Sequence, residues 1–156
     1  MPSRSHHEAG FTLVEILAIL IIIGLMSAVV ILSIPRPDSP LEKQAQLITG
    51  HLNQLAQNSI ISGRVGAVGI SKAGYALYNY EDQDWHEIKS GEWDTSYRVR
   101  FKRENKNLEL PKETTPTILF QPTGLSTAFE ISLTDGGAQY IISAQGDGHV
   151  ALRVDE

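Results

Sequence analysis

The sequence predicts an α+β fold in which a long apolar helix and a second, amphipathic helix precede a set of antiparallel strands. Three observations lead to this order. No charged residue occurs from Ile16 to Ile34. Apolar residues in the segment 41–55 recur at helical spacing, and after Gly63 apolar and polar residues alternate with the period of two typical of strands. No helices alternate with these strands, so a parallel sheet is not expected.

Length and composition limit the possible classes of protein. The chain has 156 residues, a formal net charge of -5 and no cysteine. That length allows one membrane element and one modest domain of about 100 residues. The acidic balance is unlike that of a general nucleic-acid-binding protein. The lack of cysteine excludes a disulfide framework, a zinc–thiolate site and a cysteine nucleophile.

The first predicted element is a transmembrane helix over residues 11–35. Its uncharged run, Ile16 to Ile34, reaches the length of a membrane span, and the whole range would rise about 36 Å as a helix. A secretory signal peptide has a shorter apolar core and a small-residue cleavage site, which "SIPRPDSP" does not supply. The short polar leader carries Arg4, which favours a cytoplasmic N-terminus with the remaining chain across the membrane.

Glu15 lies within the start of this apolar segment. An ionised side chain costs about 2.5–3.5 kcal/mol at mid-membrane and less near an end, so it needs water or a cationic partner. A cut between Gly10 and Phe11 would free an α-amine only four residues from Glu15. In a bundle of helices, the amine of one copy could then pair with Glu15 of another. The alternative is a carboxylate at the membrane edge that reaches water.

The sequence "GFTLVE" followed by an aliphatic run resembles the type III signal of type IV pilins and type II secretion pseudopilins. The resemblance implies that a membrane-embedded prepilin peptidase cuts after Gly10 on the cytoplasmic side and methylates the new amine of Phe11. It also implies that Glu15 serves in assembly. Further along this helix, Gly24 and Ala28 form a small-xxx-small pair that permits close helix approach. Gly24 could instead mark a flexible point of the helix.

A second helix is predicted from Ser39 to about Ser62. The prolines of "SIPRPDSP" end or kink the first helix near Pro35. The sequence "SPLE", which begins at Ser39, matches a capping box with proline at the first helical position, and Gly63 is the expected stop. An apolar stripe on this helix is expected to pack on the domain's own sheet, with a partner-helix seam as the alternative. The stripe comprises Leu41, Ala45, Ile48, Leu52 and Leu55.

Strands are predicted where the apolar period changes to two. The alternating segments are 97–102, 129–134 and 150–154. Glycine-containing turns separate strands at 72–74, 135–137 and 146–148. The segment 80–116 is rich in charged and turn residues, and its strands are not placed by the pattern.

The C-terminal half resembles the GspH domain of minor pseudopilins. The segments 117–133 and 140–152 carry the resemblance: a strand, a Pro-x-Gly turn, a second strand and a hairpin into a closing strand. The implied fold is a pilin-like helix packed on an antiparallel two-sheet β-sandwich. The implied parts are a leader (1–10), a transmembrane helix (11–35), a linker with an amphipathic helix (36–63) and a periplasmic β-rich domain (64–156).

No catalytic motif of the G-x-S-x-G, H-E-x-x-H or P-loop type occurs, and no cofactor or metal site is expected. Asp147 and His149 flank a glycine in a predicted hairpin and are interpreted as turn residues. The acidic sequence "YEDQDWHE" lacks the EF-hand pattern and is interpreted as a solvated loop. Trp85 and Trp93 are either core anchors or parts of an exposed contact surface.

One basic stripe stands out in the predicted strand region. We interpret it as a solvated strand face, with contact to an acidic subunit or to DNA as alternatives. The acidic chain and its ending "RVDE" argue against DNA. The stripe comprises Arg98, Arg100, Lys102 and Arg103.

The family resemblance implies a structural role. A minor pseudopilin is anchored in the inner membrane and joins the periplasmic pseudopilus near its tip, where it contacts the minor pseudopilins I, J and K and the major pseudopilin G. The assembly serves the export of folded proteins across the outer membrane. Three alternatives remain: a type IV pilus minor pilin in fibre initiation, a DNA-binding competence pilin and a membrane-tethered periplasmic enzyme.

Overall fold

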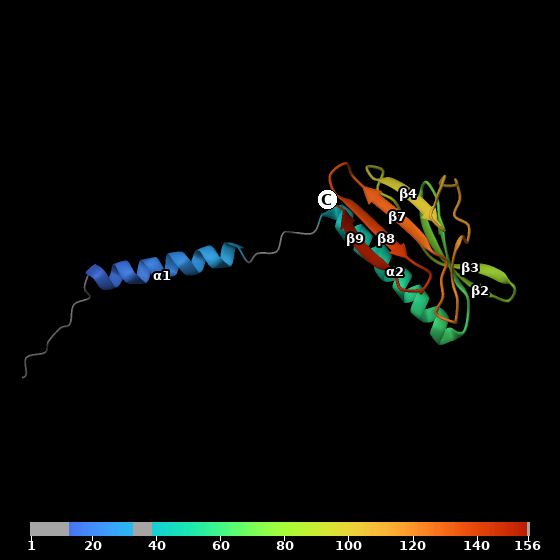
Figure 1. The fold of residues 1–156 in the computed structure, drawn as a ribbon, viewed down its shortest axis with the longest axis horizontal. Coiled ribbons are helices and arrows are strands. Elements are labelled where there is room, and N and C mark those ends of the chain that lie inside the picture. Colours follow the sequence, from blue (N-terminus) through green and yellow to red (C-terminus); the bar gives the residue numbers. More distant parts are fainter. Residues whose placement is uncertain (1–12, 33–38, 156) are drawn as a thin grey trace, which may run out of the picture. The chain divides into compact units, whose positions relative to one another are not determined.

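The computed structural model describes residues 13–32 and 39–155 (Figure 1). They belong to two compact units, one with helix α1 (Leu13–Leu32) and one with helix α2 (Pro40–Ser62) and all the described strands. The strands are β1 (Gly66–Ile70), β2 (Gly74–Glu81), β3 (Asp84–Glu92), β4 (Arg98–Arg103), β5 (Lys106–Leu108), β6 (Ile118–Phe120), β7 (Phe129–Thr134), β8 (Gln139–Ala144) and β9 (Ala151–Asp155).

Helix α2 begins and ends as the sequence predicts. The Ser39 side chain accepts a hydrogen bond from the backbone N–H of Glu42 (3.0 Å), and proline occupies the first turn. The carboxylate of Glu42 accepts a hydrogen bond from the Tyr140 hydroxyl of β8 (3.3 Å), which ties the start of the helix to a sheet. At the other end, Gly63 adopts the left-handed conformation (φ 69°) that terminates helices and that a side chain disfavours.

The strands form two antiparallel sheets. Sheet A has the order β3-β2-β1-β6, and sheet B has the order β5-β4-β7-β8-β9. The chain leaves sheet A after β3, builds β4 and β5 of sheet B, returns to sheet A with β6 and finishes in sheet B. The α+β prediction with two antiparallel sheets is therefore confirmed.

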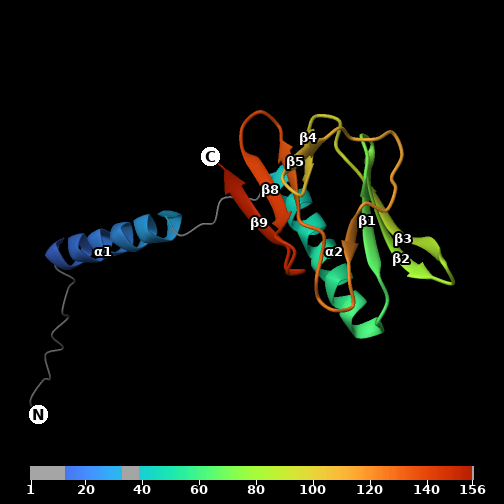
Figure 2. The same cartoon turned by 45° about the vertical axis from the view of Figure 1, so that its right-hand side comes forward.

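Helix α2 contacts strands of both sheets, as Figure 2 shows from a second direction. The predicted apolar stripe is buried, and its five members are at most 2% exposed: Leu41, Ala45, Ile48, Leu52 and Leu55. They share one core with inward side chains of sheet A, such as Val68, and of sheet B, such as Ile131. The expectation that the stripe packs on the domain's own sheets is confirmed.

The interpretation of "YEDQDWHE" as a loop is wrong. These residues form the end of β2, a tight turn and the start of β3. Asp82 and Gln83 both have positive φ angles (51° and 65°), as a two-residue hairpin turn of type I′ requires. Tyr80 and Trp85 face each other across this hairpin with ring centroids 5.0 Å apart. The packing of these two aromatic rings across the strands thus stabilises a hairpin in a segment whose charged composition predicts a loop.

Candidate functional site

Helix α1 carries the residue predicted to serve in assembly. Glu15 lies in its first turn, where the positive end of the helix dipole stabilises a carboxylate. Around it the apolar side chains are exposed, with Leu13 at 83% and Leu17 at 56%. So many exposed apolar side chains need a protein or lipid surface to cover them.

Of the other residues predicted to act in the N-terminal region, the structure describes Gly24 and Ala28 only. Gly10 and Phe11 lie outside the described residues, so cleavage and methylation stay predictions. Gly24 and Ala28 lie one turn apart in α1, and a Cβ built at Gly24 would meet no atom within 4 Å. Within residues 13–32 and 39–155, no helix combines the length and the apolar character needed to cross a membrane.

The four side chains of the predicted basic stripe do not all lie on the same face of β4. Lys102 forms an ion pair with Glu130 of the neighbouring strand β7 (2.7 Å), while Arg98 and Arg100 are exposed on the same face of β4. Arg103 does not share this face, because side chains alternate along a strand. The grouping of all four side chains on one face is therefore wrong, and one of the three that do share it is already neutralised.

The two tryptophans have different surroundings. Trp93 is buried in the core (7% exposed), and its indole N–H donates to the backbone oxygen of Ser71 (2.8 Å). Trp85 is half-buried on the outer face of sheet A, where it packs against the small cluster of Ala67, Ala76 and Tyr78. Trp93 is thus a core anchor, whereas Trp85 lies over a small outer cluster.

A histidine–tyrosine pair joins α2 to sheet A. His51 Nδ1 lies 3.0 Å from the hydroxyl of Tyr75, which also packs against Trp93 with ring centroids 5.3 Å apart. Burial lowers the pKa of His51, with the positive charge of Lys89 as a second cause. Burial also raises the pKa of Tyr75, so its hydroxyl keeps its proton and can donate it to a neutral imidazole.

This pair predicts a pH-dependent stability for a fragment of residues 38–156. Because the pKa of His51 is lowered on folding, the unfolded chain binds the proton more readily. The contribution of the pair is complete above the usual histidine pKa of about 6.5 and is lost as the pH falls towards the lower, folded value. Urea unfolding at pH 7.5 and 5.5 measures the loss. We expect His51→Gln to reduce the difference in the free energy of unfolding between the two pH values. The variant His149→Gln, in the β8–β9 turn, should leave this difference unchanged.

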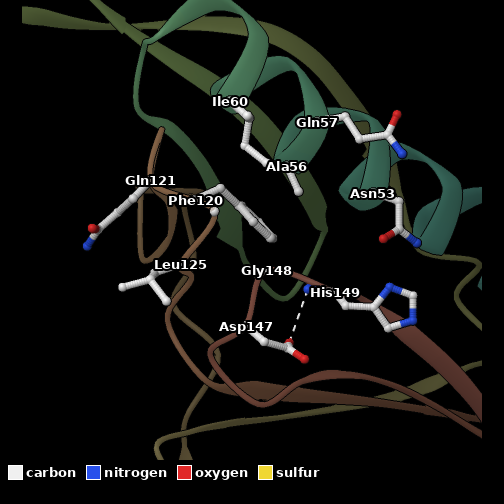
Figure 3. A pocket seen from close by; sticks show the side chains of 11 residues that line it. Asn53, Ala56, Gln57, Ile60, Phe120, Gln121, Leu125, Asp147, Gly148 and His149 are labelled. Carbon is white, nitrogen blue, oxygen red and sulfur yellow. Dashed lines mark hydrogen bonds between the residues drawn. The ribbon is translucent and has the colours of Figure 1, made fainter.

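A small pocket lies between the C-terminal half of α2 and two loops of the sheets (Figure 3). Its volume is about 210 Å³, and Ala56 and Phe120 provide its buried apolar surface. Ile60 of α2 and Leu125 of the β6–β7 loop lie on its sides, and Asp147 lies in the β8–β9 loop. The pocket therefore combines an apolar interior with a polar rim.

The turn interpretation of Asp147 and His149 is confirmed. Asp147 Oδ1 accepts a hydrogen bond from the backbone N–H of His149 (3.1 Å), which closes a local turn. In Figure 3 the imidazole of His149 extends away from the carboxylate. Among the described residues, no group of three or more histidine, aspartate or glutamate side chains could hold a metal ion.

Asn53 of α2 binds the backbone at the end of the β8–β9 loop, which forms one wall of this pocket. Its amide nitrogen donates to the backbone oxygen of Val150 (2.9 Å), and its oxygen accepts from the backbone N–H of the same residue (3.1 Å). Val150 is buried (2% exposed), so both backbone groups depend on this amide. Asn53 thus holds the β8–β9 loop against α2.

We expect Asn53→Ala to lower the free energy of unfolding by about 1–3 kcal/mol, because two backbone polar groups lose their partner. Gln54→Ala, at the exposed neighbouring position of α2, should change it by less than about 0.5 kcal/mol. Urea denaturation of residues 38–156 measures both values. Equal effects of the two variants would contradict the bridging role of Asn53.

Sequence reasoning missed this pocket and two of the residues that join α2 to its surroundings, His51 and Asn53. One signal was present: Ile60 and Ile61 lie outside the buried stripe of α2. Apolar side chains on the polar side of an amphipathic helix indicate a further contact surface. The loops that complete the pocket are distant in sequence and carry no motif.

An apolar N-terminal helix, followed by a second helix packed on two antiparallel sheets, is the organisation of pilin-like subunits. Residues 44–148 match the family model described as type II transport protein GspH, and the chain therefore belongs to this family. It is 28% identical to the type II secretion system protein H of Aeromonas hydrophila, over 98% of this chain and 97% of that protein.

Solved structures agree on the fold. The minor pseudopilin EpsH from the type 2 secretion system of Vibrio cholerae superimposes with a TM-score of 0.62 at 18% identity, covering 74% of this chain and 97% of that one. A crystal structure of EpsH from the same organism gives the same TM-score and covers 72% of this chain. The recognition of a GspH-type minor pseudopilin of type II secretion from sequence is confirmed.

Proposed function

We propose that this pseudopilin is a structural subunit near the tip of the type II secretion pseudopilus and is needed for the export of folded proteins across the outer membrane. The single observation that carries the proposal is the family match over residues 44–148, which includes most of α2 and every described strand except β9. The prepilin-like sequence before α1 supports it, because such a signal serves entry into a fibre.

The proposed topology follows from the same signal. Residues 1–10 form a cytoplasmic leader, residues 11–35 anchor the chain in the inner membrane, and the domain from α2 onward is periplasmic. The position of Glu15 in the first turn of α1 supports this topology, because a carboxylate near the end of a span costs less than one at its centre. Assembly into the pseudopilus follows processing.

The proposed partners are the minor pseudopilins I, J and K, the major pseudopilin G and, during processing, the prepilin peptidase. A structural role without enzymatic activity or nucleic-acid binding is part of the proposal. The ion pair of Lys102 with Glu130 supports the last point, since it removes a positive charge from the face on which Arg98 and Arg100 lie.

Processing provides the first test. We expect mass spectrometry of the mature chain from its own host to show an N-methylated Phe11 as the first residue. Gly10→Arg should block cleavage, because the small residue at the cut is replaced by a large charged one, whereas Gly10→Ala should retain part of it. An intact Met1 start in the wild-type chain would contradict the pseudopilin processing pathway.

Secretion provides the second test. Deleting the gene should stop the appearance of exported proteins in the medium while they accumulate in the periplasm, and the intact chain should restore export. Normal secretion after the deletion would exclude a required role in export. A loss of surface pili with normal secretion would instead identify a minor pilin of a type IV pilus.

A further inference from the structure

The end of the domain formed by the C-terminal part of α2 and two loops is almost without charge. No aspartate, glutamate, lysine or arginine occurs in residues 44–63 or 121–128, and the segment 145–149 contains only Asp147. The next charged residue after the helix is Arg64, which forms an ion pair with Glu81 of β2 (3.0 Å). Charged residues make up 20% of the whole chain, so this end differs from the rest of the surface. Such a surface is suited to contact with protein rather than to permanent exposure to water.

Large apolar side chains gather at this end. Ile61 is 83% exposed, Leu125 is 56% exposed and Ile60 is 53% exposed. Ile60 and Leu125 lie directly beside the pocket, which has Ala56 and Phe120 inside (Figure 3). An exposed apolar surface around a pocket marks a binding site more often than isolated apolar residues do.

The size of the pocket indicates what enters it. Its volume is about 210 Å³, and an apolar cavity of about 150 Å³ can hold a benzene ring. One leucine, isoleucine, methionine or phenylalanine side chain would therefore fit. No lysine or arginine side chain lines the pocket, so an acidic ligand would find no permanent positive charge there.

The walls of the pocket are fixed before any partner arrives. The backbone N–H of Ser126 donates to the oxygen of Gly146 (2.9 Å), which joins the two loops. Gly148 has a positive φ angle (73°), and a Cβ at this position would collide with the carbonyl oxygen of Gly124. With Asn53 holding Val150, these contacts reduce the entropy that binding must overcome.

The position of the pocket along α2 restricts the direction of approach. The N-terminal end of α2 is the end connected through the chain to α1, and the pocket lies towards the C-terminal end. A helix of 23 residues extends about 35 Å. A subunit that covers this pocket therefore stacks on the end of the domain remote from the connection to the N-terminal helix.

We propose that this uncharged end is the docking surface for a different pilin-like subunit, which inserts one apolar side chain into the pocket beside Ile60 and Leu125. The proposal rests on the proposed function, because it assumes a fibre in which subunits stack. It adds the surface, the chemistry of the contact and the side of the domain on which the neighbour lies.

Photo-crosslinking in the host's own secretion system tests the proposal. A benzoylphenylalanine is placed at Gln57, on the exposed rim of the pocket, or at Gln46, an exposed glutamine nearer the start of the same helix. We expect the full-length chain labelled at position 57 to crosslink to another subunit that carries a prepilin signal, at least fivefold more than the chain labelled at position 46. Peptide mapping should place the attachment next to an apolar side chain.

Lysine substitutions then test the apolar contact. Ile61→Lys and Leu125→Lys should each reduce the crosslink at least fivefold and lower secretion. Ile88→Lys, at a site in β3 that is 49% exposed, should do neither. Thermal unfolding of residues 38–156 checks that each variant is folded.

The outcomes separate this inference from the proposed function. A strong crosslink from position 57 that persists in both lysine variants would overturn the inference, as would equal crosslinks from positions 57 and 46 or a crosslink only to another copy of this chain. If the gene is required for secretion and these variants secrete normally, the docking surface is wrong and the function stands. If deletion of the gene has no effect, the function itself is wrong.

Discussion

Glu15→Val is expected to leave the chain inserted, cleaved and anchored but to reduce its incorporation into the pseudopilus and the secretion that depends on it. Valine keeps an apolar helix, so anchoring is retained. What is lost is the carboxylate in the first turn of α1, the proposed partner of the Phe11 amine of a neighbouring subunit. A charge in a low-dielectric bundle is far more costly unpaired than paired, so the pair would favour one axial stagger between helices.

Crosslinking to neighbouring pseudopilins and a secretion assay, both at native expression level, measure this effect. Glu15→Asp should be intermediate, because the side chain keeps its charge but is shorter. Normal crosslinks and normal secretion from Glu15→Val would show that Glu15 has no assembly role in this subunit. That result would leave room for a tip subunit whose own Phe11 amine pairs with a neighbour's glutamate.

Leu52→Ala is expected to lower the free energy of unfolding of residues 38–156 by about 2–5 kcal/mol. Leu52 is fully buried (0% exposed) in the core that α2 shares with both sheets, so the lost side chain leaves a cavity that packed strands cannot fill. A loss of that size is a large part of the 5–15 kcal/mol typical of a domain. Urea unfolding monitored by circular dichroism measures it.

Leu47→Ala is the matched control for this change. Leu47 lies on the same helix but is 53% exposed, so its truncation removes little buried surface and should cost less than about 1 kcal/mol. Similar losses from the two variants would show that α2 does not pack on the sheets by the stripe that contains Leu52.

The features that the sequence predicts well are local. Helix α2, its Ser39 cap, its Gly63 stop and its buried stripe all depend on residues within a few turns of one another. The same holds for the turns at 135–137 and 146–148, which connect strands that pair with their neighbours in the chain. Spacing alone predicts such features, because helix and strand periods decide which side chains share a face.

Apart from β4, which the alternating residues 97–102 predict, the strands of the segment 80–116 escaped prediction for a physical reason. Strand β3 lies at the edge of sheet A and is mostly exposed, so it carries no alternating apolar pattern. Tyr80 and Trp85 stabilise the hairpin by packing across the strands, and the turn at Asp82 requires positive φ angles without a glycine to signal them. An edge strand satisfies its hydrogen bonds on one side and can remain polar.

The sequence by itself determined the α+β class and the buried face of α2, and it predicts an N-terminal signal with Gly10, Phe11 and Glu15, because each of these features depends on adjacent or periodic residues. Only the tertiary structure decided that β6 leaves its chain neighbour β7 and pairs with β1, with Val68 opposite Ile118. It also decided that the β6–β7 and β8–β9 loops, which β7 and β8 separate in the chain, meet beside α2 to form the pocket. Such contacts depend on how the sheets close over one shared core, and residues far apart in the chain carry no common period that could predict them.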